Sequence, residues 1–340
     1  MNATPIQTTD VTIIGAGPVG LYAIFQCGML GMKIEVVDAL PEIGGQCTAL
    51  YPEKPIYDVA GFPEVAAADL IEQLEQQAAP FNPNYHLNQS VTGLEEIEGG
   101  YRITTAKDTV IETKAIIIAA GAGAFGPNRP PLAGIEDYEG SAVFYAVRRR
   151  DDLKGKRIVI AGGGDSAVDW ALSLHEIAKR VTVIHRRDKF RAIPDNVAKM
   201  RALAEADKLD LVIPYQLHAL DGDGTNLNQV ILKSMDGDEK VIEADTLLPF
   251  FGLATDLGPL KDWGIAFEKS QITIAPSTGE TSKPGIFAVG DVATYPGKLK
   301  LIVNGFGEAA TAAHNAYAKV FPGQALHFEY STTKGVPGAA

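Results

Sequence analysis

A glycine-rich loop near the amino terminus constrains the fold more than any other stretch of this sequence. The loop runs from Gly15 to Gly20, reads GAGPVG, follows a short apolar run and opens a longer one. A second strand-like run, residues 34–37, ends directly before Asp38. This succession of strand, glycine turn, helix, strand and acid is typical of a dinucleotide-binding βαβ unit.

The three glycines of this loop have separate roles in such a unit. Gly15 makes the tight turn, Gly17 lets the backbone approach a pyrophosphate, and Gly20 lets the helix pack against the strand. The helix N-terminus presents free N–H groups and the positive end of its dipole to the phosphates. Asp38 can accept hydrogen bonds from a ribose hydroxyl. The loop predicts a dinucleotide site, and the alternative is a glycine-rich turn without a ligand.

The same order of elements recurs in the second half of the chain. Residues 157–161 read as a strand, residues 162–167 as a GxGxxA loop, and residues 168–178 as a helix. Each half then continues through short alternating runs to an apolar strand that ends in glycine, at Gly121 and at Gly252. This internal duplication predicts two nucleotide sites.

The short alternating runs predict an antiparallel β-meander in each half, over residues 90–113 and 210–244. We therefore expect an α/β fold with two Rossmann-like dinucleotide-binding domains in three layers (ββα), each with an inserted meander. The tail carries a further strand and a helix that return to the first domain. We expect a discontinuous first domain over residues 1–120 and 254–340, and a second over residues 121–253.

The second strands of the two halves are followed by opposite charges. Where the first half has Asp38, the second has His185-Arg186-Arg187, with Arg191 four residues on. A carboxylate favours a free 2′-hydroxyl, whereas guanidinium groups hold a 2′-phosphate by charge-assisted bonds. Two such bonds would favour NADPH over NADH on the order of a hundredfold. The alternative is a solvated surface run of arginines.

Two sites that differ in this way indicate a flavoprotein that keeps one dinucleotide and exchanges the other. Gly290-Asp291, at the end of an apolar run, can hydrogen-bond the ribityl chain or pyrophosphate of FAD. A helix that begins near Asn304 can direct its N-terminus at the flavin. We expect FAD in the first domain and NADP(H) in the second.

Composition narrows the class of protein further. A formal net charge of −12 disfavours nucleic-acid binding, and two cysteines fit a reducing compartment. The uncharged residues 11–32 are broken by glycines and Pro18, which argues against a membrane span. No basic residue precedes them, which argues against a signal peptide. We expect a cytoplasmic protein without stable membrane association.

Nearly the whole chain resembles the two-dinucleotide-binding-domain flavoproteins of the thioredoxin reductase branch. The resemblance is carried by Gly44-Gly45-Gln46 and by residues 162–167, 185–187, 190–192 and 285–291. The Cys-x-x-Cys pair of that branch is missing, because residues 144–150 contain no cysteine. The other known arrangement is missing too, since Pro52 stands where Cys47 would need a partner. Disulfide reduction through an internal dithiol is therefore excluded.

What remains resembles the thioredoxin-reductase-like (type 2) ferredoxin/flavodoxin–NADP+ reductases. This resemblance implies a homodimeric, FAD-dependent enzyme that couples hydride transfer at flavin N5 to single-electron transfer with ferredoxin or flavodoxin. It implies that Tyr51 stacks on one face of the flavin and that Tyr330 of the partner subunit's tail covers the other. No acid–base residue and no metal site is assigned.

The candidate site residues form two sets, one for each cofactor. The FAD set is Gly15, Gly17, Gly20, Asp38, Gln46, Tyr51, Val91, Phe125, Asp291 and Thr332. The NADP(H) set is Gly162, Gly164, Asp165, Ser166, His185, Arg186, Arg187 and Arg191. In the first set, the resemblance alone implies Val91, Phe125 and Thr332.

Three other functions are compatible with the same residues. They are an NADPH oxidase or diaphorase, a non-catalytic NADP(H)-sensing flavoprotein, and a reductase whose disulfide lies on a partner protein. Docking of an acidic ferredoxin needs local positive charge, and the candidates are Lys54, Lys298, Lys300 and Lys334, each of which can equally be a solvated surface residue. We expect hinges near residues 121–126 and near Gly252.

Overall fold

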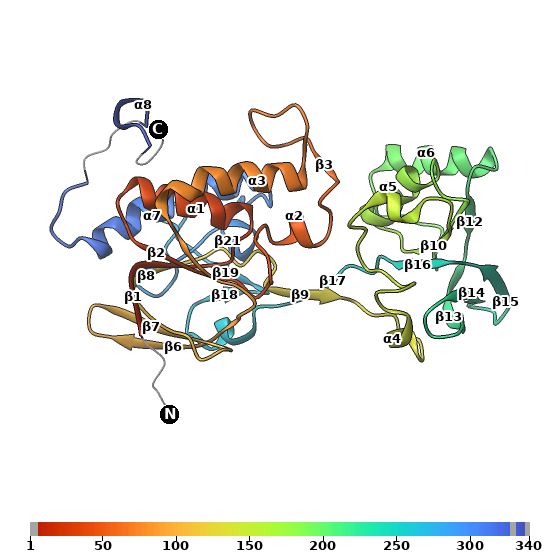
Figure 1. The fold of residues 1–340 in the computed structure, drawn as a ribbon, viewed down its shortest axis with the longest axis horizontal. Coiled ribbons are helices and arrows are strands. Elements are labelled where there is room, and N and C mark those ends of the chain that lie inside the picture. The colour runs from red at the N-terminus through yellow and green to blue at the C-terminus, as the bar shows by residue number, and fades with distance from the viewer. Residues whose placement is uncertain (1–5, 327–330, 337–340) are drawn as a thin grey trace. The chain divides into compact units, whose positions relative to one another are not determined.

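The computed structural model describes residues 6–326 and 331–336 of the 340-residue chain (Figure 1). The chain divides into two compact units, which are described separately below. Unit 1 comprises Met1–Phe125 and Thr255–Ala340, and unit 2 comprises Gly126–Ala254. None of the helices in the described residues is long and apolar enough to span a bilayer.

Unit 1 is built on a parallel sheet in the order β5-β2-β1-β8, with β20 also paired to β8. The strands are β1 (Gln7–Ile14), β2 (Ile34–Val37), β5 (Asn84–His86), β8 (Val110–Ile118) and β20 (Ile286–Ala288). The C-terminal halves of the two central strands, residues 11–14 of β1 and 115–118 of β8, are buried and largely apolar because both faces of the sheet are covered there. Ile13, Ile116, Ile117 and Ile118 have no exposed surface.

The predicted meander of the first half is an extension of this sheet and not a separate insertion. β6 (Val91–Ile97) pairs with β7 (Gly100–Thr105), and β7 pairs antiparallel with residues 110–113 of β8. The sequence prediction treated residues 109–113 as a meander strand and residues 115–121 as a separate apolar strand, which is wrong, because residues 110–118 form one strand. Neither Gly nor Pro interrupts this stretch. One strand therefore continues through it, with β7 and then β20 on the same edge.

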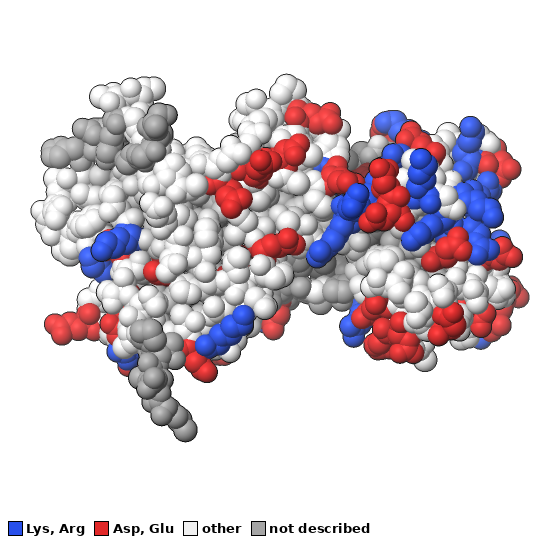
Figure 2. Space-filling model, viewed as in Figure 1, with Lys and Arg blue, Asp and Glu red and all other residues white. Residues whose placement is uncertain are grey.

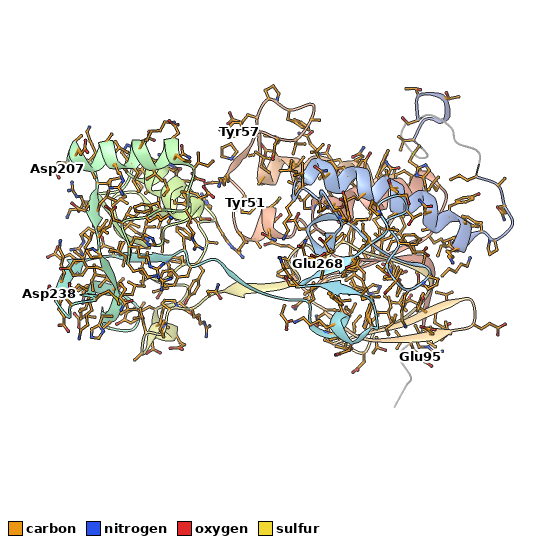
Figure 3. All side chains as sticks on the ribbon, turned by 180° about the vertical axis from the view of Figure 1, so that it is seen from behind. Tyr51, Tyr57, Glu95, Asp207, Asp238 and Glu268 are labelled. Atoms are coloured by element: carbon orange, nitrogen blue, oxygen red, sulfur yellow. The ribbon has the colours of Figure 1, made fainter. Side chains whose placement is uncertain are left out.

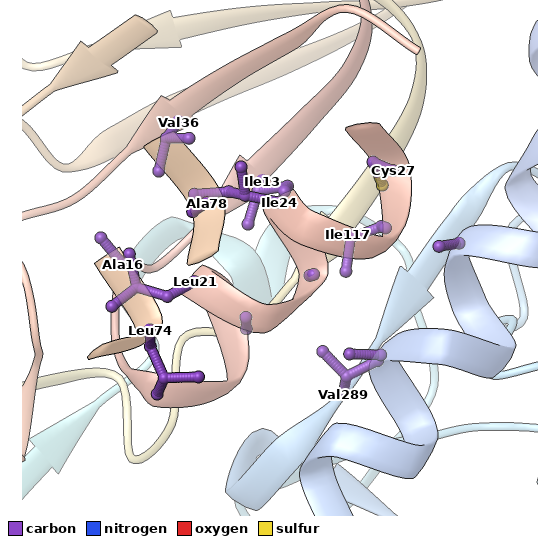
Figure 4. Packing of buried hydrophobic residues seen from close by; sticks show 14 of the residues in the cluster. Ile13, Ala16, Leu21, Ile24, Cys27, Val36, Leu74, Ala78, Ile117 and Val289 are labelled. Atoms are coloured by element: carbon purple, nitrogen blue, oxygen red, sulfur yellow. The ribbon is translucent and has the colours of Figure 1, made fainter. Parts of the chain in front are cut away.

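Helices cover one face of the sheet, and short irregular segments with the meander cover the other. The helices are α1 (Pro18–Met29), α3 (Ala67–Ala78) and α7 (Ile302–Val320). Leu21, Ile24 and Leu74 pack against Ile13 and Ile117 of the sheet on this side (Figure 4). On the opposite face Ile103, Ile111, Trp263 and Ile272 form a second apolar cluster. The result is the expected three-layer arrangement.

Unit 2 repeats the plan with fewer elements. Its parallel sheet has the order β12-β11-β10-β16, and its antiparallel meander has the order β13-β14-β15. The parallel strands are β10 (Arg157–Ala161), β11 (Arg180–Ile184), β12 (Asp210–Val212) and β16 (Thr246–Pro249). The meander strands are β13 (Tyr215–Gly222), β14 (Leu227–Ser234) and β15 (Glu239–Glu243). The helices are α5 (Asp165–Leu174) and α6 (Pro194–Glu205).

The sequence prediction placed residues 210–212 in the second meander, and this is wrong. They form β12, which lies parallel to β11 at the edge of the central sheet. Thr182 and Arg180 of β11 both donate to the Asp210 carboxylate, which fixes this pairing.

The remaining elements are short. In unit 1 they are α2 (Gln46–Ala49), β3 (Pro55–Ile56), β4 (Val65–Ala66), η1 (Ala79–Phe81), η3 (Gly258–Asp262), β18 (Phe267–Glu268), β19 (Gln271–Thr273), η4 (Gly290–Val292), β21 (Ala293–Thr294) and α8 (Ser331–Lys334). In unit 2 they are α4 (Ile135–Tyr138) and η2 (Arg150–Leu153). The strands β9 (Ala124–Pro127) and β17 (Leu253–Asp256) carry the chain from one unit to the other.

Candidate functional site

Packing within unit 1 fixes two glycines of the first loop. Gly15 has φ +107°, and a Cβ there would lie 2.4 Å from the Ala119 carbonyl oxygen. A Cβ on Gly20 would lie 1.9 Å from the Gly15 carbonyl oxygen. Both positions are closed to any side chain. These two glycines therefore set the shape of the turn and seat α1 on it, as the sequence predicts.

Gly17 differs, because the protein leaves it room for a side chain. A Cβ there would meet only the Cα of Gly45, at 3.9 Å. Gly17 is the extended N-cap of α1, so its open side lies at the helix N-terminus. The double glycine lies against the same loop, since the Gly44 N–H donates to the Ala16 carbonyl at 2.8 Å. Packing does not require Gly17, and a bound phosphate would.

Asp38 is built into the loop from the end of β2. Its Oδ2 accepts the Ala16 N–H at 2.6 Å, and its Oδ1 accepts the Leu40 N–H at 2.8 Å. Its residue surface is 8% exposed. Burial raises the pKa of this carboxyl, and the two backbone hydrogen bonds act in the opposite direction. Each oxygen keeps a further lone pair, which a ribose hydroxyl can use.

Tyr51 follows the double glycine and α2 (Figure 3), and Cys47 of α2 lies close to it. The Cys47 Sγ is 3.9 Å from the Tyr51 Oη. Burial raises the pKa of Tyr51, and the nearby Cys47 and Asp291 raise it further, so the phenol is neutral. Burial also raises the pKa of the Cys47 thiol and of the Cys27 thiol. Both cysteines are free and buried, so neither is a reactive thiolate at neutral pH.

Asp291 is held at its backbone on both sides. The Gly290 N–H donates to Glu308 Oε2 of α7 at 2.8 Å, and the Asp291 carbonyl accepts the Gln271 amide at 2.9 Å. The start of α7 also closes on α1, because a Cβ on Gly305 would lie 2.4 Å from Val19. The Gly-Asp turn and the first turns of α1 and α7 therefore converge.

The positions of the other predicted FAD residues say less about a bound cofactor. Gln46 begins α2, and its Nε2 lies 3.9 Å from where a Gly121 Cβ would stand. Val91 is a core residue at the start of β6, 6% exposed. Phe125 lies in β9, but its side chain is outside the described part of the structure. Thr332 is exposed in α8, and Tyr330 falls outside the described residues.

The glycines of the loop in unit 2 are likewise of two kinds: packing closes two of them to a side chain and leaves the third open. A Cβ on Gly162 would lie 2.7 Å from the Phe250 carbonyl oxygen, and one on Gly163 would lie 2.4 Å from the His185 ring. At Gly164, the N-cap of α5, nothing lies within 4 Å. Asp165 and Ser166 follow it, exposed in the first turn of α5. As at Gly17, packing within the protein does not require a glycine at Gly164, whereas a bound phosphate would.

Two hydrogen bonds fold residues 185–193, which we call the arginine loop, back onto this glycine loop. The Arg191 N–H donates to the Gly163 carbonyl at 2.7 Å. The Ile193 N–H donates to Asp165 Oδ1 at 2.9 Å. The sequence interpretation assigned Asp165 to cofactor binding and missed this anchoring contact, since a loop-to-helix hydrogen bond leaves no signal in residue spacing.

The arginine loop concentrates positive charge around His185. Burial lowers the pKa of His185, and the charges of Arg186, Arg191 and Arg187 lower it further, so the imidazole is neutral at neutral pH. All three arginines are exposed, and within the described residues no carboxylate forms an ion pair with them. Basic side chains are frequent on the face of unit 2 that holds α5 and α6 (Figure 2). Unpaired guanidinium groups beside a helix N-terminus are suited to a phosphate dianion.

One predicted docking lysine is misplaced. The Lys298 side chain is 5% exposed and forms an ion pair with Glu308, itself 10% exposed. The prediction that Lys298 is a surface charge is therefore wrong. Lys300, two residues on, is exposed beside Leu299 and Leu301.

Two units that each place a glycine loop at the N-terminus of a helix define a two-domain dinucleotide-binding protein. Residues 9–316 match the protein family described as "Pyridine nucleotide-disulphide oxidoreductase", and the chain belongs to that family. The chain is 57% identical over 340 residues to a ferredoxin–NADP reductase of Rhodospirillum rubrum, covering 99% of this chain and 98% of that protein. It is 55% identical over 330 residues to a ferredoxin–NADP reductase of Paramagnetospirillum magneticum, covering 97% and 98%.

Solved structures agree with the fold. The T. acidophilum thioredoxin reductase has a TM-score of 0.76 at 27% identity, covering 92% of this chain and 98% of that one. The Lactococcus lactis thioredoxin reductase has a TM-score of 0.75 at 29% identity, covering 92% and 99%. The predicted fold class and family resemblance are thereby confirmed.

Proposed function

We propose that this chain is an FAD-dependent ferredoxin–NADP+ reductase that passes electrons between NADP(H) and ferredoxin or flavodoxin. One observation carries the proposal. The two glycine loops are alike, but a buried carboxylate, Asp38, completes the first and three unpaired arginines stand beside the second. The names of the relatives at 55–57% identity support the same activity.

The residues of unit 1 fit FAD. Gly17 leaves the N-terminus of α1 open to a pyrophosphate, and Asp38 presents lone pairs to the ribose. Asp291 and the first turn of α7 would hold the flavin end, and Tyr51 would lie against the ring system. When bound, FAD supplies the conversion between hydride transfer and single-electron transfer.

The residues of unit 2 fit NADP(H). Gly164 and the first turn of α5 would hold the pyrophosphate, and Arg186, Arg187 and Arg191 would hold the 2′-phosphate. Hydride transfer needs no protein acid or base, so the chain contributes position and electrostatics. The neutral Tyr51 phenol and the buried Cys47 thiol add no competing charge or nucleophile.

The finer assignments extend the proposal. Residues 1–120 with 254–340 bind FAD, and residues 121–253 bind NADP(H). The protein is a homodimer in which Tyr330 and Thr332 of the partner subunit complete the flavin site. It works in the cytoplasm without stable membrane association, and two buried free thiols are compatible with that compartment.

The test is to purify the protein, record its flavin spectrum and measure NADPH oxidation with ferredoxin, flavodoxin and oxygen side by side. We expect bound FAD, reduction by NADPH within seconds, and faster turnover with ferredoxin or flavodoxin than with oxygen. A dominant oxygen rate would instead identify an oxidase or diaphorase. A flavin that NADPH does not bleach would identify a non-catalytic sensor.

A further inference from the structure

The arginine loop contains one acid that the proposed function leaves without a role. Asp188 stands between Arg187 and Lys189, in the middle of the basic run. A carboxylate beside a phosphate site lowers the positive potential there and can instead accept a hydrogen bond from a free ribose 2′-hydroxyl. The direction in which Asp188 points therefore bears on the choice between NADPH and NADH.

Asp188 is paired with Arg201, which comes from α6. Arg201 Nη2 donates to Asp188 Oδ1. The Arg201 guanidinium also lies over the Phe190 ring, 5.7 Å from its centroid. The Phe190 ring centroid is in turn 5.1 Å from that of His185. Arg201 thus holds the acid of the arginine loop while resting on an aromatic side chain of the same loop.

The ends of the loop are anchored without Arg201. At the C-terminal end, Gly163 and Asp165 accept the backbone N–H groups of Arg191 and Ile193. At the N-terminal end, the His185 N–H donates to the Val212 carbonyl at 3.3 Å. The helix that carries Arg201 is tied to α5 by another contact, the Asn196 amide donating to Asp169 Oδ1 at 3.0 Å. Truncating Arg201 would therefore leave the loop and α6 in place and release mainly the Asp188 carboxylate.

The pair is too exposed to matter much for folding. The Arg201 and Asp188 side chains are 40% and 68% exposed, and exposed ion pairs contribute little to stability. The pair does, however, determine where the negative charge of the Asp188 carboxylate lies, because Arg201 binds it. Once released, Asp188 can pair with the other cations of the same loop, the three unpaired guanidinium groups and Lys189. Each pair that it forms with a guanidinium group would compete with a 2′-phosphate.

We propose that Arg201 is a positioning residue that maintains selectivity for a 2′-phosphate by keeping Asp188 away from Arg186, Arg187 and Arg191. This inference rests on the proposed function, because it takes the arginine loop as the 2′-phosphate site of NADP(H). It adds a selectivity determinant on α6, outside the arginine loop.

The experiment measures the affinity of two probes, adenosine 2′,5′-bisphosphate and adenosine 5′-monophosphate, by calorimetry on the full-length FAD-loaded protein. The variants are Arg201→Gln, the conservative control Arg201→Lys, Asp188→Asn, and the double variant Arg201→Gln with Asp188→Asn. Each is measured at low and at high ionic strength. The ratio of the two affinities reports selectivity, which a merely structural role would not move.

We expect Arg201→Gln to lower the affinity for adenosine 2′,5′-bisphosphate about fivefold at low ionic strength. The affinity for adenosine 5′-monophosphate should stay unchanged. Adding Asp188→Asn should restore the bisphosphate affinity, Arg201→Lys should stay close to wild type, and high ionic strength should reduce the effect. Asp188→Asn alone should change little, because its charge is already withheld.

Three results would overturn the inference, two of them in variants that carry Arg201→Gln. One is an equal loss for both probes in Arg201→Gln, and the other is failure of the double variant to recover. A gain of several-fold from Asp188→Asn alone would also refute it, since the carboxylate would then already face the phosphate in the wild type. If the wild type itself shows no preference for the bisphosphate, the NADP(H) assignment of unit 2 fails instead.

Discussion

The buried ion pair between Lys298 and Glu308 yields the most demanding prediction, because it holds the turn that carries Asp291. Glu308 accepts three donors: Lys298 and Tyr295 at Oε1, and the Gly290 N–H at Oε2. Burial and Glu308 raise the pKa of Tyr295 to about 12, so its hydroxyl remains a donor. Replacing Glu308 by Gln should therefore loosen the whole turn.

The two partners should not be equivalent. Glu308→Gln leaves the Lys298 ammonium buried without a counter-charge, which costs about 3–5 kcal/mol. Lys298→Met also leaves a buried charge, the Glu308 carboxylate, but its two remaining hydrogen-bond donors offset part of the cost, so the expected loss is smaller, about 1.5–3 kcal/mol. In a unit of this size each kcal/mol lowers Tm by about 2–4 °C. Glu308→Gln should then lower the Tm of unit 1 by about 6–20 °C.

The assays are calorimetric unfolding, hydrogen exchange at the Gly290 amide, and FAD titration of the apoprotein. Exchange at Gly290 should quicken and FAD affinity should fall in Glu308→Gln. Replacing both residues, Lys298→Met with Glu308→Gln, should recover part of the stability, because no charge is left buried. Lys300→Met, at an exposed neighbour, is the matched control. The reasoning is refuted if Glu308→Gln unfolds at the same temperature as the Lys300→Met control. It is also refuted if the double variant is less stable than Glu308→Gln.

Three further predictions concern the glycine loops and the arginine loop. Alanine at both Arg186 and Arg187 should shift the preference in steady-state kinetics from NADPH towards NADH with FAD retained; unchanged NADPH affinity would contradict the 2′-phosphate assignment. Gly17→Ala should keep the fold but weaken FAD binding, whereas Gly20→Ala should destabilise the apoprotein by about 1–3 kcal/mol in denaturant unfolding; equal behaviour would count against a ligand at Gly17. The pKa of His185 is lowered in the folded unit 2, so below about pH 6.5 the unfolded chain binds a proton more readily than the folded one. The free energy of unfolding should therefore be highest above about pH 6.5 and should fall as the pH drops from there through the lowered pKa of the folded state. An NMR titration midpoint of His185 at or above about 6.5 would refute this, and binding of adenosine 2′,5′-bisphosphate should raise the midpoint.

Much of the fold could be predicted because the glycine loops and apolar strands carry strong local signals. The helix of the first loop starts at Pro18 because Gly17 is its N-cap and Pro suits the first helical position. The meander boundaries were less predictable. Whether residues 109–118 form one strand or two depends on β7 and β20 sharing one edge of β8, and the pattern of a single strand does not record its neighbours.

The site was predictable where chemistry follows directly from position along the chain. Asp38 and the arginines stand at the ends of second strands, and the structure finds them beside the glycine loops. Lys298 was misread because a lysine in a polar loop normally lies on the surface, and its partner Glu308 is on α7. The Asp188–Arg201 contact also joins two elements, so neither residue signals its partner in the sequence.

The two loops also explain why one cofactor should stay bound while the other exchanges. In unit 1 the site is assembled from the starts of α1 and α7 and from the Gly44-Gly45 and Gly290-Asp291 turns, and its acid is buried. Several of these segments would have to separate before FAD could leave. In unit 2 the 2′-phosphate would rest on three exposed side chains of one loop, whose interactions with a ligand are screened by solvent and salt. Since both glycine loops have the same backbone plan, the proposed difference between a resident and a diffusing cofactor would follow from the burial of the charged groups that would hold each one.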